Sequence, residues 1–157
     1  MHSSLVVKPL SQHRALTDLV EGWLLSEWPR WYGPDGSGDV GEDVRAFASS
    51  EIRLPIGLVA FEQGRPVGIG ALKAESVSSH RHLTPWAASG YVLPECRGRG
   101  IGAGILSSLV AYAKVLGFAR VYCGTSTSES LLTRCGWSVL EVTQHDSKAL
   151  TVFRSEA

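Results

Sequence analysis

The sequence has no excess charge of either sign, few cysteines and no long apolar run, and each absence narrows its function. Lys plus Arg and Asp plus Glu number 15 each among 157 residues, so no positive field favours nucleic acid and no acidic excess favours disorder. No apolar run approaches the roughly 18 residues of a membrane span. The opening residues 1–5 lack a basic segment followed by an apolar one. We therefore expect one domain without nucleic-acid or membrane partners.

The cysteine pattern argues against a disulfide framework. Cys96, Cys123 and Cys135 form no C-x-x-C pair, and an odd number cannot all pair within one chain. Reduced thiols in the cytoplasm fit this pattern best, and no metal site is expected. We interpret Cys96 and Cys135 as small buried apolar residues.

The chain does contain a glycine- and arginine-rich run between a predicted strand and a predicted helix. Residues 87–93 read as a buried strand, and apolar residues then recur at Ile101, Ile105 and Leu109. The glycines therefore lie at a helix N-terminus, where unpaired amides and the helix dipole favour an anion. Arg97 and Arg99 add charged donors. The run predicts a phosphate-binding loop.

Two familiar phosphate loops do not fit this run. A P-loop needs Lys-Ser or Lys-Thr after its glycines, and neither follows here. A dinucleotide fingerprint is answered by an acidic residue about 20 positions on, and the next predicted strand, 121–125, carries none.

The remaining spacing, Arg-x-x-Gly-x-Gly at Arg97, Gly100 and Gly102, resembles the GNAT superfamily of acetyl-coenzyme A dependent N-acetyltransferases. Segments 117–122 and 131–137 resemble the family's next strand and its "LYxRxGF/W" segment. The resemblance implies an α/β (α+β) fold, with a mixed, mostly antiparallel sheet of about six to seven strands flanked by about four helices.

The resemblance also implies a cosubstrate, acetyl-coenzyme A, and a site for it. The backbone amides of Tyr91 and Val92 would face the cofactor and stabilise the developing oxyanion. Gly90 would permit a bulge where the central strands separate. The implied cofactor-binding residues are Tyr91, Val92, Arg97, Gly98, Arg99, Gly100, Ile101, Gly102, Ala103, Thr125 and Ser128.

The general acid and base do not carry over from the family. Leu132 occupies the position of the usual tyrosine acid, which leaves Ser128, Ser130 or Tyr91 to protonate the thiolate. The central strand begins without the usual glutamate, so Glu27, Glu75, His80 or His82 would serve as base. The segment 80–82 also reads as an ordinary solvated loop.

Aromatic residues are candidates for the acceptor pocket. Trp28, Trp31 and Tyr32 lie in or beside a predicted loop at 30–39, and Trp86 lies at the entry of the central strand. Trp23 lies on an apolar helix face and is expected in the core. Cys123, at a strand end, is a candidate contact for the acetyl group.

The chain divides into alternating predicted elements. Ser11 is expected to cap the first helix, which ends near Trp28. A strand at 150–153 would either offer an edge for dimer pairing or be covered within the monomer. The predicted strands are 5–8, 56–62, 66–74, 87–93, 120–125, 137–142 and 149–153, and the other predicted helices are 40–49, 100–116 and 128–134.

We therefore expect an N-acetyltransferase that acts on a primary amine of a small molecule, peptide or protein, as a monomer or homodimer. The alternative is a non-catalytic module that binds or senses acyl-coenzyme A. A third reading is a nucleotide-binding protein that uses the same glycine loop.

Overall fold

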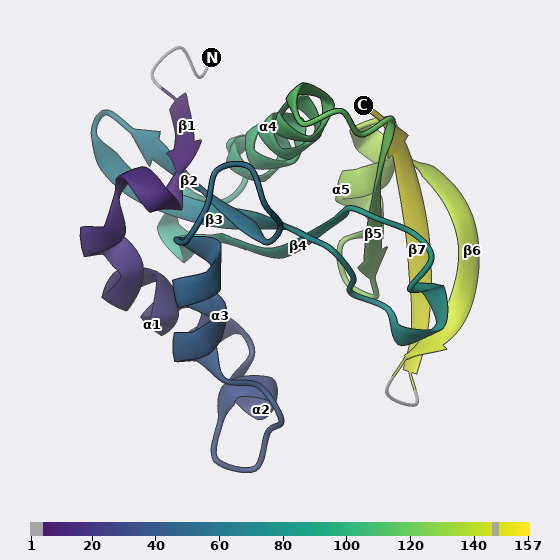
Figure 1. Ribbon diagram of the computed structural model, residues 1–157, viewed down its shortest axis with the longest axis horizontal. Helices are drawn as coiled ribbons and strands as arrows, with labels where there is room; N and C mark the ends of the chain where they lie inside the picture. Colours follow the sequence, from purple (N-terminus) through teal and green to yellow (C-terminus); the bar gives the residue numbers. More distant parts are fainter. Residues whose placement is uncertain (1–4, 146–147) are drawn as a thin grey trace.

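A computed structural model describes residues 5–145 and 148–157. Residues 1–4, on which the prediction about export partly rests, lie outside the described residues. Seven strands form one sheet in the order β1-β2-β3-β4-β5-β7-β6, and helices cover it (Figure 1). The predicted fold class is confirmed. The strands are β1 Leu5–Pro9, β2 Ile56–Glu62, β3 Arg65–Lys73, β4 Trp86–Val92, β5 Arg120–Thr125, β6 Ser138–His145 and β7 Lys148–Glu156.

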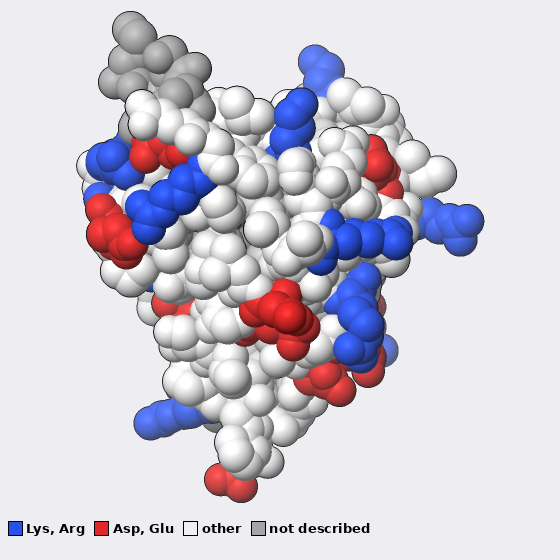
Figure 2. Space-filling model, turned by 90° about the vertical axis from the view of Figure 1, so that its left-hand side faces the viewer, with Lys and Arg blue, Asp and Glu red and all other residues white. Residues whose placement is uncertain are grey.

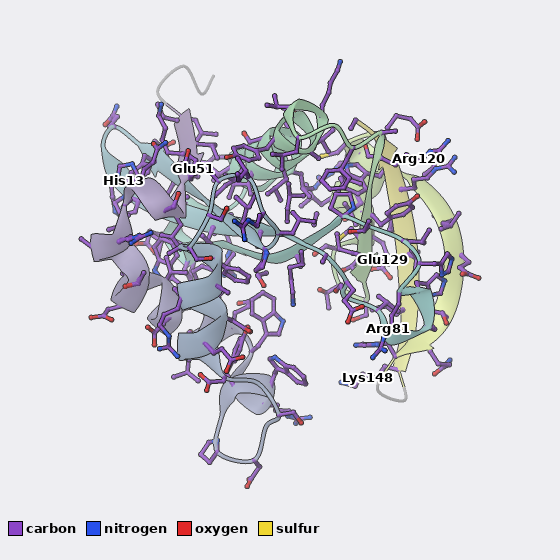
Figure 3. The ribbon with its side chains drawn as sticks, viewed as in Figure 1. His13, Glu51, Arg81, Arg120, Glu129 and Lys148 are labelled. Atoms are coloured by element: carbon purple, nitrogen blue, oxygen red, sulfur yellow. The ribbon has the colours of Figure 1, made fainter. Side chains whose placement is uncertain are left out.

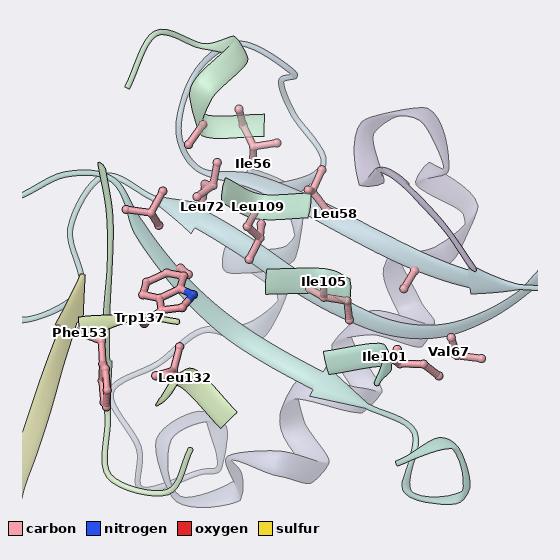
Figure 4. Close-up of a cluster of buried hydrophobic side chains, with 14 of the residues drawn as sticks. Ile56, Leu58, Val67, Leu72, Ile101, Ile105, Leu109, Leu132, Trp137 and Phe153 are labelled. Carbon is pink, nitrogen blue, oxygen red and sulfur yellow. The ribbon is translucent and has the colours of Figure 1, made fainter. Parts of the chain in front are cut away.

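The helices pack on both faces of the sheet, α4 opposite α1 and α3 (Figure 1). The periodic apolar residues of α4 bury against β2 and β3, and Figure 4 shows Ile101, Ile105 and Leu109 above these strands. Gly68 and Gly70 allow this close approach, because a Cβ there would lie 2.9 and 2.6 Å from Ile105. The helices are α1 Thr17–Glu27, α2 Pro29–Tyr32, α3 Val40–Phe47, α4 Ile101–Val115 and α5 Glu129–Arg134.

The centre of the sheet holds its one parallel pair of strands among the described residues. β4 and β5 share a single register pair, between Trp86 at the start of β4 and Tyr122 in the middle of β5. All other neighbours are antiparallel and pair over five or more residues. Beyond Trp86 and Tyr122, β4 and β5 diverge toward their C-terminal ends (Figure 1).

Two predicted features of the N-terminal third are wrong. Ser11 does not cap the first helix: it lies in a short 3-10 turn, and α1 begins at Thr17. The predicted loop at 30–39 starts with the helical turn α2, because Pro29 fits the first turn of a helix. A cap missed in the sequence is Asp39, whose carboxylate accepts the amide of Glu42 at 3.0 Å.

Of the two readings of residues 150–153, the structure supports the covered strand and not the dimer edge. These residues belong to β7, which lies between β5 and β6. The edge strands of the sheet are β1 and β6, and Val139 and Val142 of β6 are exposed. Within the described ranges, no helix is long and apolar enough to cross a membrane.

Candidate active site

A bulge shapes the C-terminal half of β4. Ser89 and Gly90 together lie opposite Gly70 of β3, one residue more than a regular ladder holds. Ser89 adopts a positive φ of 56°, a conformation that increases local twist at a bulge. The predicted bulge at Gly90 is therefore present, whereas the positive φ of Ser89 had no signal in the sequence.

Beyond the bulge, the peptide groups of β4 alternate between two sides. The amide of Leu93 donates to the carbonyl of Val67 at 2.9 Å, so the amide of Tyr91 also points toward β3. The amide of Val92 then points to the other side, where β5 has separated from β4. Of the two amides predicted to face the cofactor, the structure therefore places only that of Val92 on the open edge.

The glycine loop joins this open edge to α4. Gly98 and Gly100 adopt φ values of +78° and +83°, and Gly100 is the N-cap residue of α4, without a side-chain cap. The first amides of α4, those of Ile101, Gly102 and Ala103, have no acceptor within the helix. A Cβ at Gly98 would meet nothing within 4 Å. The open backbone and the helix dipole fit an anion.

The arginines of the loop are held by carboxylates rather than left facing the loop. Arg99 donates to Glu62 at 2.7 Å, and Arg97 lies 3.6 Å from Glu27. Figure 2 shows acidic and basic side chains interleaved on this side of the molecule. A phosphate bound by Arg97 or Arg99 would therefore either share the guanidinium with its carboxylate partner or displace that partner.

Glu95, which lies next to the loop arginines in the sequence, forms its ion pair with Arg65 of β3. The two side chains meet at 2.8 Å. The residue's own backbone amide, and then the Arg65 guanidinium, hold the pKa of the Glu95 carboxyl below its usual range. This residue therefore stays ionised and is a poor candidate for a base.

On the face of the sheet opposite α4, the end of α1 approaches the open end of β4. The Trp23 ring stacks on the Tyr91 ring, with centroids 5.7 Å apart, and Trp23 is buried, as predicted. Glu27 lies one turn later on α1 and reaches Arg97. Glu27 is therefore the candidate base that the described contacts link to the open end of β4.

The aromatic residues after α1 are only partly available. Trp28 and Trp31 are 36% and 47% exposed, and the Trp31 indole packs over the backbone of Gly38. The Tyr32 hydroxyl donates to the Asp43 carboxylate at 2.7 Å. Burial raises the pKa of this hydroxyl, and the hydrogen bond to Asp43 and its negative charge raise it further. Trp28 and Trp31 thus stay candidates for acceptor contact, while the Tyr32 hydroxyl is already engaged.

Trp86 is not a pocket residue, contrary to the prediction. It is fully buried, and its indole N–H donates to the carbonyl of Leu83 at 2.7 Å. Its ring lies 5.7 Å from that of Tyr122, at the point where β4 and β5 still pair. Trp86 therefore lies in the core where β4 and β5 are paired and does not line the gap between their C-terminal ends.

The predicted loop histidines also lie away from the opening. His80 is buried, with one ring nitrogen against Ser79 and the other against Glu141 of β6, so the solvated-loop reading is wrong for His80. Its neighbour Arg81 lies at the opposite end of the β5–β7 half from α4, near Lys148 (Figure 3). The structure therefore does not bring His80 to the open end of β4.

The other two candidates from this loop share its location. The His82 ring stacks on that of His80 at 5.9 Å. Glu75 lies 3.9 Å from Arg81. Neither residue has a described contact with the open end of β4.

The turn after β5 is organised by Thr125. Its hydroxyl accepts the amides of Thr127 and Ser128 at 3.2 and 2.9 Å, which leads the chain into α5. Ser128 is half-buried and Ser130 is exposed. Leu132 is buried in the core, so no proton donor replaces the missing tyrosine at that position.

The three thiols differ in environment. Cys96 is buried, as predicted, but Cys135 is exposed, which corrects the interpretation of that residue. Burial raises the pKa of the Cys123 thiol to about 12, so this side chain is an unreactive neutral group. No group of three or more His, Cys, Asp or Glu in the described part of the chain could hold a metal ion.

A hollow of about 400 Å³ lies elsewhere, on the loop formed by residues 49–54. Tyr112, near the C-terminal end of α4, donates to the carbonyl of Glu51 in this loop. The hollow therefore lies at the end of α4 opposite the glycine loop and is separate from the candidate site.

Comparisons with known proteins agree with this geometry. An aminoglycoside 6'-N-acetyltransferase solved with coenzyme A shares 14% identity, covers 96% of both chains and has a TM-score of 0.76. The aminoglycoside 6'-N-acetyltransferase from Enterococcus faecium shares 15% identity over 96% of both chains, with a TM-score of 0.75. YncA, a putative acetyltransferase from Salmonella typhimurium solved with acetyl-CoA, shares 19% identity over 98% of this chain and 94% of its own, with a TM-score of 0.68.

These structures share the fold at low identity. No curated protein sequence matches the chain. Residues 20–137 match the acetyltransferase (GNAT) family, a span that includes residues 20–27 of α1, the bulged β4, the glycine loop and α5. The chain therefore belongs to the GNAT acetyltransferase family of acyltransferase enzymes.

Proposed function

We propose that this enzyme transfers the acetyl group of acetyl-coenzyme A to a primary amine by direct attack within a ternary complex. The observation that carries the proposal is the divergence of β4 and β5 after the single pair Trp86↔Tyr122. This divergence leaves the edge of β4 open beside a glycine-rich helix N-terminus. The cosubstrate supplies an activated acetyl thioester.

The chain's own residues would hold the cosubstrate through backbone groups. The amides from Gly98 to Ala103 and the dipole of α4 would bind its pyrophosphate. The Val92 amide would donate to the acetyl oxygen as negative charge develops there, a contribution that is often the largest in acyl transfer. Gly98 fits this role, because its positive φ and open surroundings let an anion approach the backbone.

Proton transfer would fall to weaker groups. Glu27 would take the proton from the acceptor ammonium, directly or through water, since it reaches the open end of β4 through Arg97. The thiolate has an ordinary thiol pKa of about 8.5 and is a tolerable leaving group near neutral pH. Water or the half-buried Ser128 hydroxyl would protonate it.

The acceptor would lie between the end of α1 and the open edge of β4. Exposed Trp28 and Trp31 offer aromatic faces to a cationic amine. The two aminoglycoside acetyltransferases of similar fold make an aminoglycoside one sensible member of the first panel. Peptide and protein amines belong in the same panel.

A second candidate function is a module that binds acyl-coenzyme A without turnover. Burial of Leu132 at the position of the usual acid favours it. The two functions differ in one reaction, the amine-dependent release of free thiol from acetyl-coenzyme A.

The test measures thiol release with an aminoglycoside, a polyamine, a lysine peptide and a peptide α-amine. An acetyltransferase releases thiol in proportion to acetylated product with at least one amine. Saturable coenzyme A binding without release by any amine would support the binding module instead.

A further inference from the structure

Arg97 connects the two halves of the proposed site. Its Nε donates to the carbonyl of Val92 at 2.8 Å, and its guanidinium carbon lies 5.3 Å from the centre of the Tyr91 ring. A terminal nitrogen lies 3.6 Å from a carboxylate oxygen of Glu27. One side chain therefore touches the open edge of β4 and the end of α1, and it begins the glycine loop.

The acceptor side of this network is fixed by packing. Trp23 and Glu27 are four residues apart on α1 and so lie on one face of the helix. The stacking of Trp23 on Tyr91 docks that face against β4. Glu27 is consequently held beside Arg97 rather than reaching it by chance.

The contacts of Arg97 are of a kind that can be exchanged. The side chains of Arg97 and Glu27 are 49% and 40% exposed, and an ion pair this exposed changes an equilibrium by less than about fivefold. A pyrophosphate offers two charged groups to the same guanidinium, in bidentate geometry.

We infer that Arg97 is a positioning residue that exchanges partners when the cofactor binds. Its side chain then breaks its contacts with Glu27 and the Val92 carbonyl and binds the pyrophosphate instead. The inference rests on the proposed function. Before the exchange, Arg97 covers the β4 edge and neutralises Glu27. After it, the edge is open and the Glu27 carboxylate is available to the acceptor amine.

The test is a titration of coenzyme A by calorimetry against the wild type and Glu27→Gln. Removing the competing carboxylate should tighten coenzyme A binding about two- to fivefold. Glu75→Gln is the matched control, because Glu75 forms an ion pair with Arg81 away from this network, and it should bind like the wild type.

Two further measurements separate exchange from a general charge effect. In an Arg97→Gln background, Glu27→Gln should add no further tightening. The side-chain Nε–H signal of Arg97 in nuclear magnetic resonance, identified by its loss in that variant, should shift when coenzyme A saturates the wild type.

The outcomes distinguish the inference from the function on which it rests. An unmoved Arg97 signal, an unchanged affinity in Glu27→Gln, or equal tightening in both backgrounds would overturn the exchange, while coenzyme A binding leaves the proposed function standing. Failure of the wild type to bind coenzyme A would overturn the proposed function and the exchange together.

Discussion

The two ends of β4 have opposite surroundings. At its start, Trp86 pairs with Lys73 of β3 and Tyr122 of β5 and is fully buried. At its end, Val92 pairs with Gly68 of β3 and with no residue of β5 in the described sheet, and its carbonyl accepts a hydrogen bond from the Arg97 side chain. The same strand is thus part of a continuous sheet at one end and an open edge at the other.

This difference explains why neighbouring aromatic residues have different roles. Trp86 and Tyr91 lie on one strand, but the bulge at Ser89 and Gly90 separates them. Residues before the bulge hold β4 to β5, and residues after it present a free amide beside the glycine loop. Changes before the bulge should therefore affect stability, and changes after it should affect ligand binding and turnover.

The largest effect is expected at the closed end. Trp86→Ala removes a fully buried side chain and its hydrogen bond to Leu83, which should lower the free energy of unfolding by about 3–5 kcal/mol. Urea denaturation measures this change. Ile52→Ala, at a position that is 74% exposed, should stay within about 0.5 kcal/mol of the wild type. If Trp86→Ala had wild-type stability, Trp86 would not be the core contact that holds β4 and β5 together.

At the open end, Val92→Pro should act on turnover. Proline removes the amide that faces away from β3, and no bond of the β3 ladder is lost with it. We expect kcat to fall by about 10²–10³-fold in a protein that still folds and binds coenzyme A, with a lower unfolding midpoint because the Val92 side chain packs against the core. Unchanged turnover in a folded variant would remove the Val92 amide from the mechanism.

Glycine substitutions sharpen the same contrast on α4. Gly98→Ala and Gly117→Ala both place a Cβ at positive φ, +78° and +96°, with nothing else within 4 Å. Each should cost about 1 kcal/mol of stability. Only Gly98→Ala should weaken coenzyme A binding, by about tenfold, measured by calorimetry. Equal affinities in the two variants would show that the loop does not bind the cofactor.

The smallest effect concerns the thiols. The pKa of Cys123 is raised to about 12 by burial, so its thiolate fraction at pH 8–9 is below about one in a thousand. In the native protein, iodoacetamide should modify exposed Cys135 and leave Cys123 and Cys96 intact, as read by mass spectrometry. Rapid labelling of Cys123 together with loss of activity would place a reactive thiol in the site.

Local patterns predicted the elements that build the site. The period of Ile101, Ile105 and Leu109 located α4, and the glycines before it located its N-terminus. The bounds of β2 and β5 agree with the prediction, and those of the other strands differ by one to three residues at their ends. These features depend on residues close together in the sequence.

Features that depend on distant contacts could not be predicted. The sequence indicates an acceptor-pocket position for Trp86, but its burial depends on packing against Tyr122 of the neighbouring strand β5. The sequence indicates His80 as a candidate base, but its ring contacts Glu141 of β6, which lies 61 residues further along the chain. No local pattern predicts that contact. The engagement of Arg97 by Glu27 and Arg99 by Glu62 follows the same pattern. These pairings depend on the order of strands in the sheet, which no single segment of the sequence predicts.

One measurement tests the open edge and the glycine loop together: thermal unfolding of the protein with acetyl-coenzyme A, coenzyme A, ATP or NAD. A ligand at about 100 times its dissociation constant stabilises the folded state by roughly 2.7 kcal/mol. We predict a clear rise in Tm with acetyl-coenzyme A and coenzyme A and little change with ATP or NAD. No rise with either coenzyme, or a larger rise with ATP or NAD, would contradict an acetyl-coenzyme A site between β4 and β5.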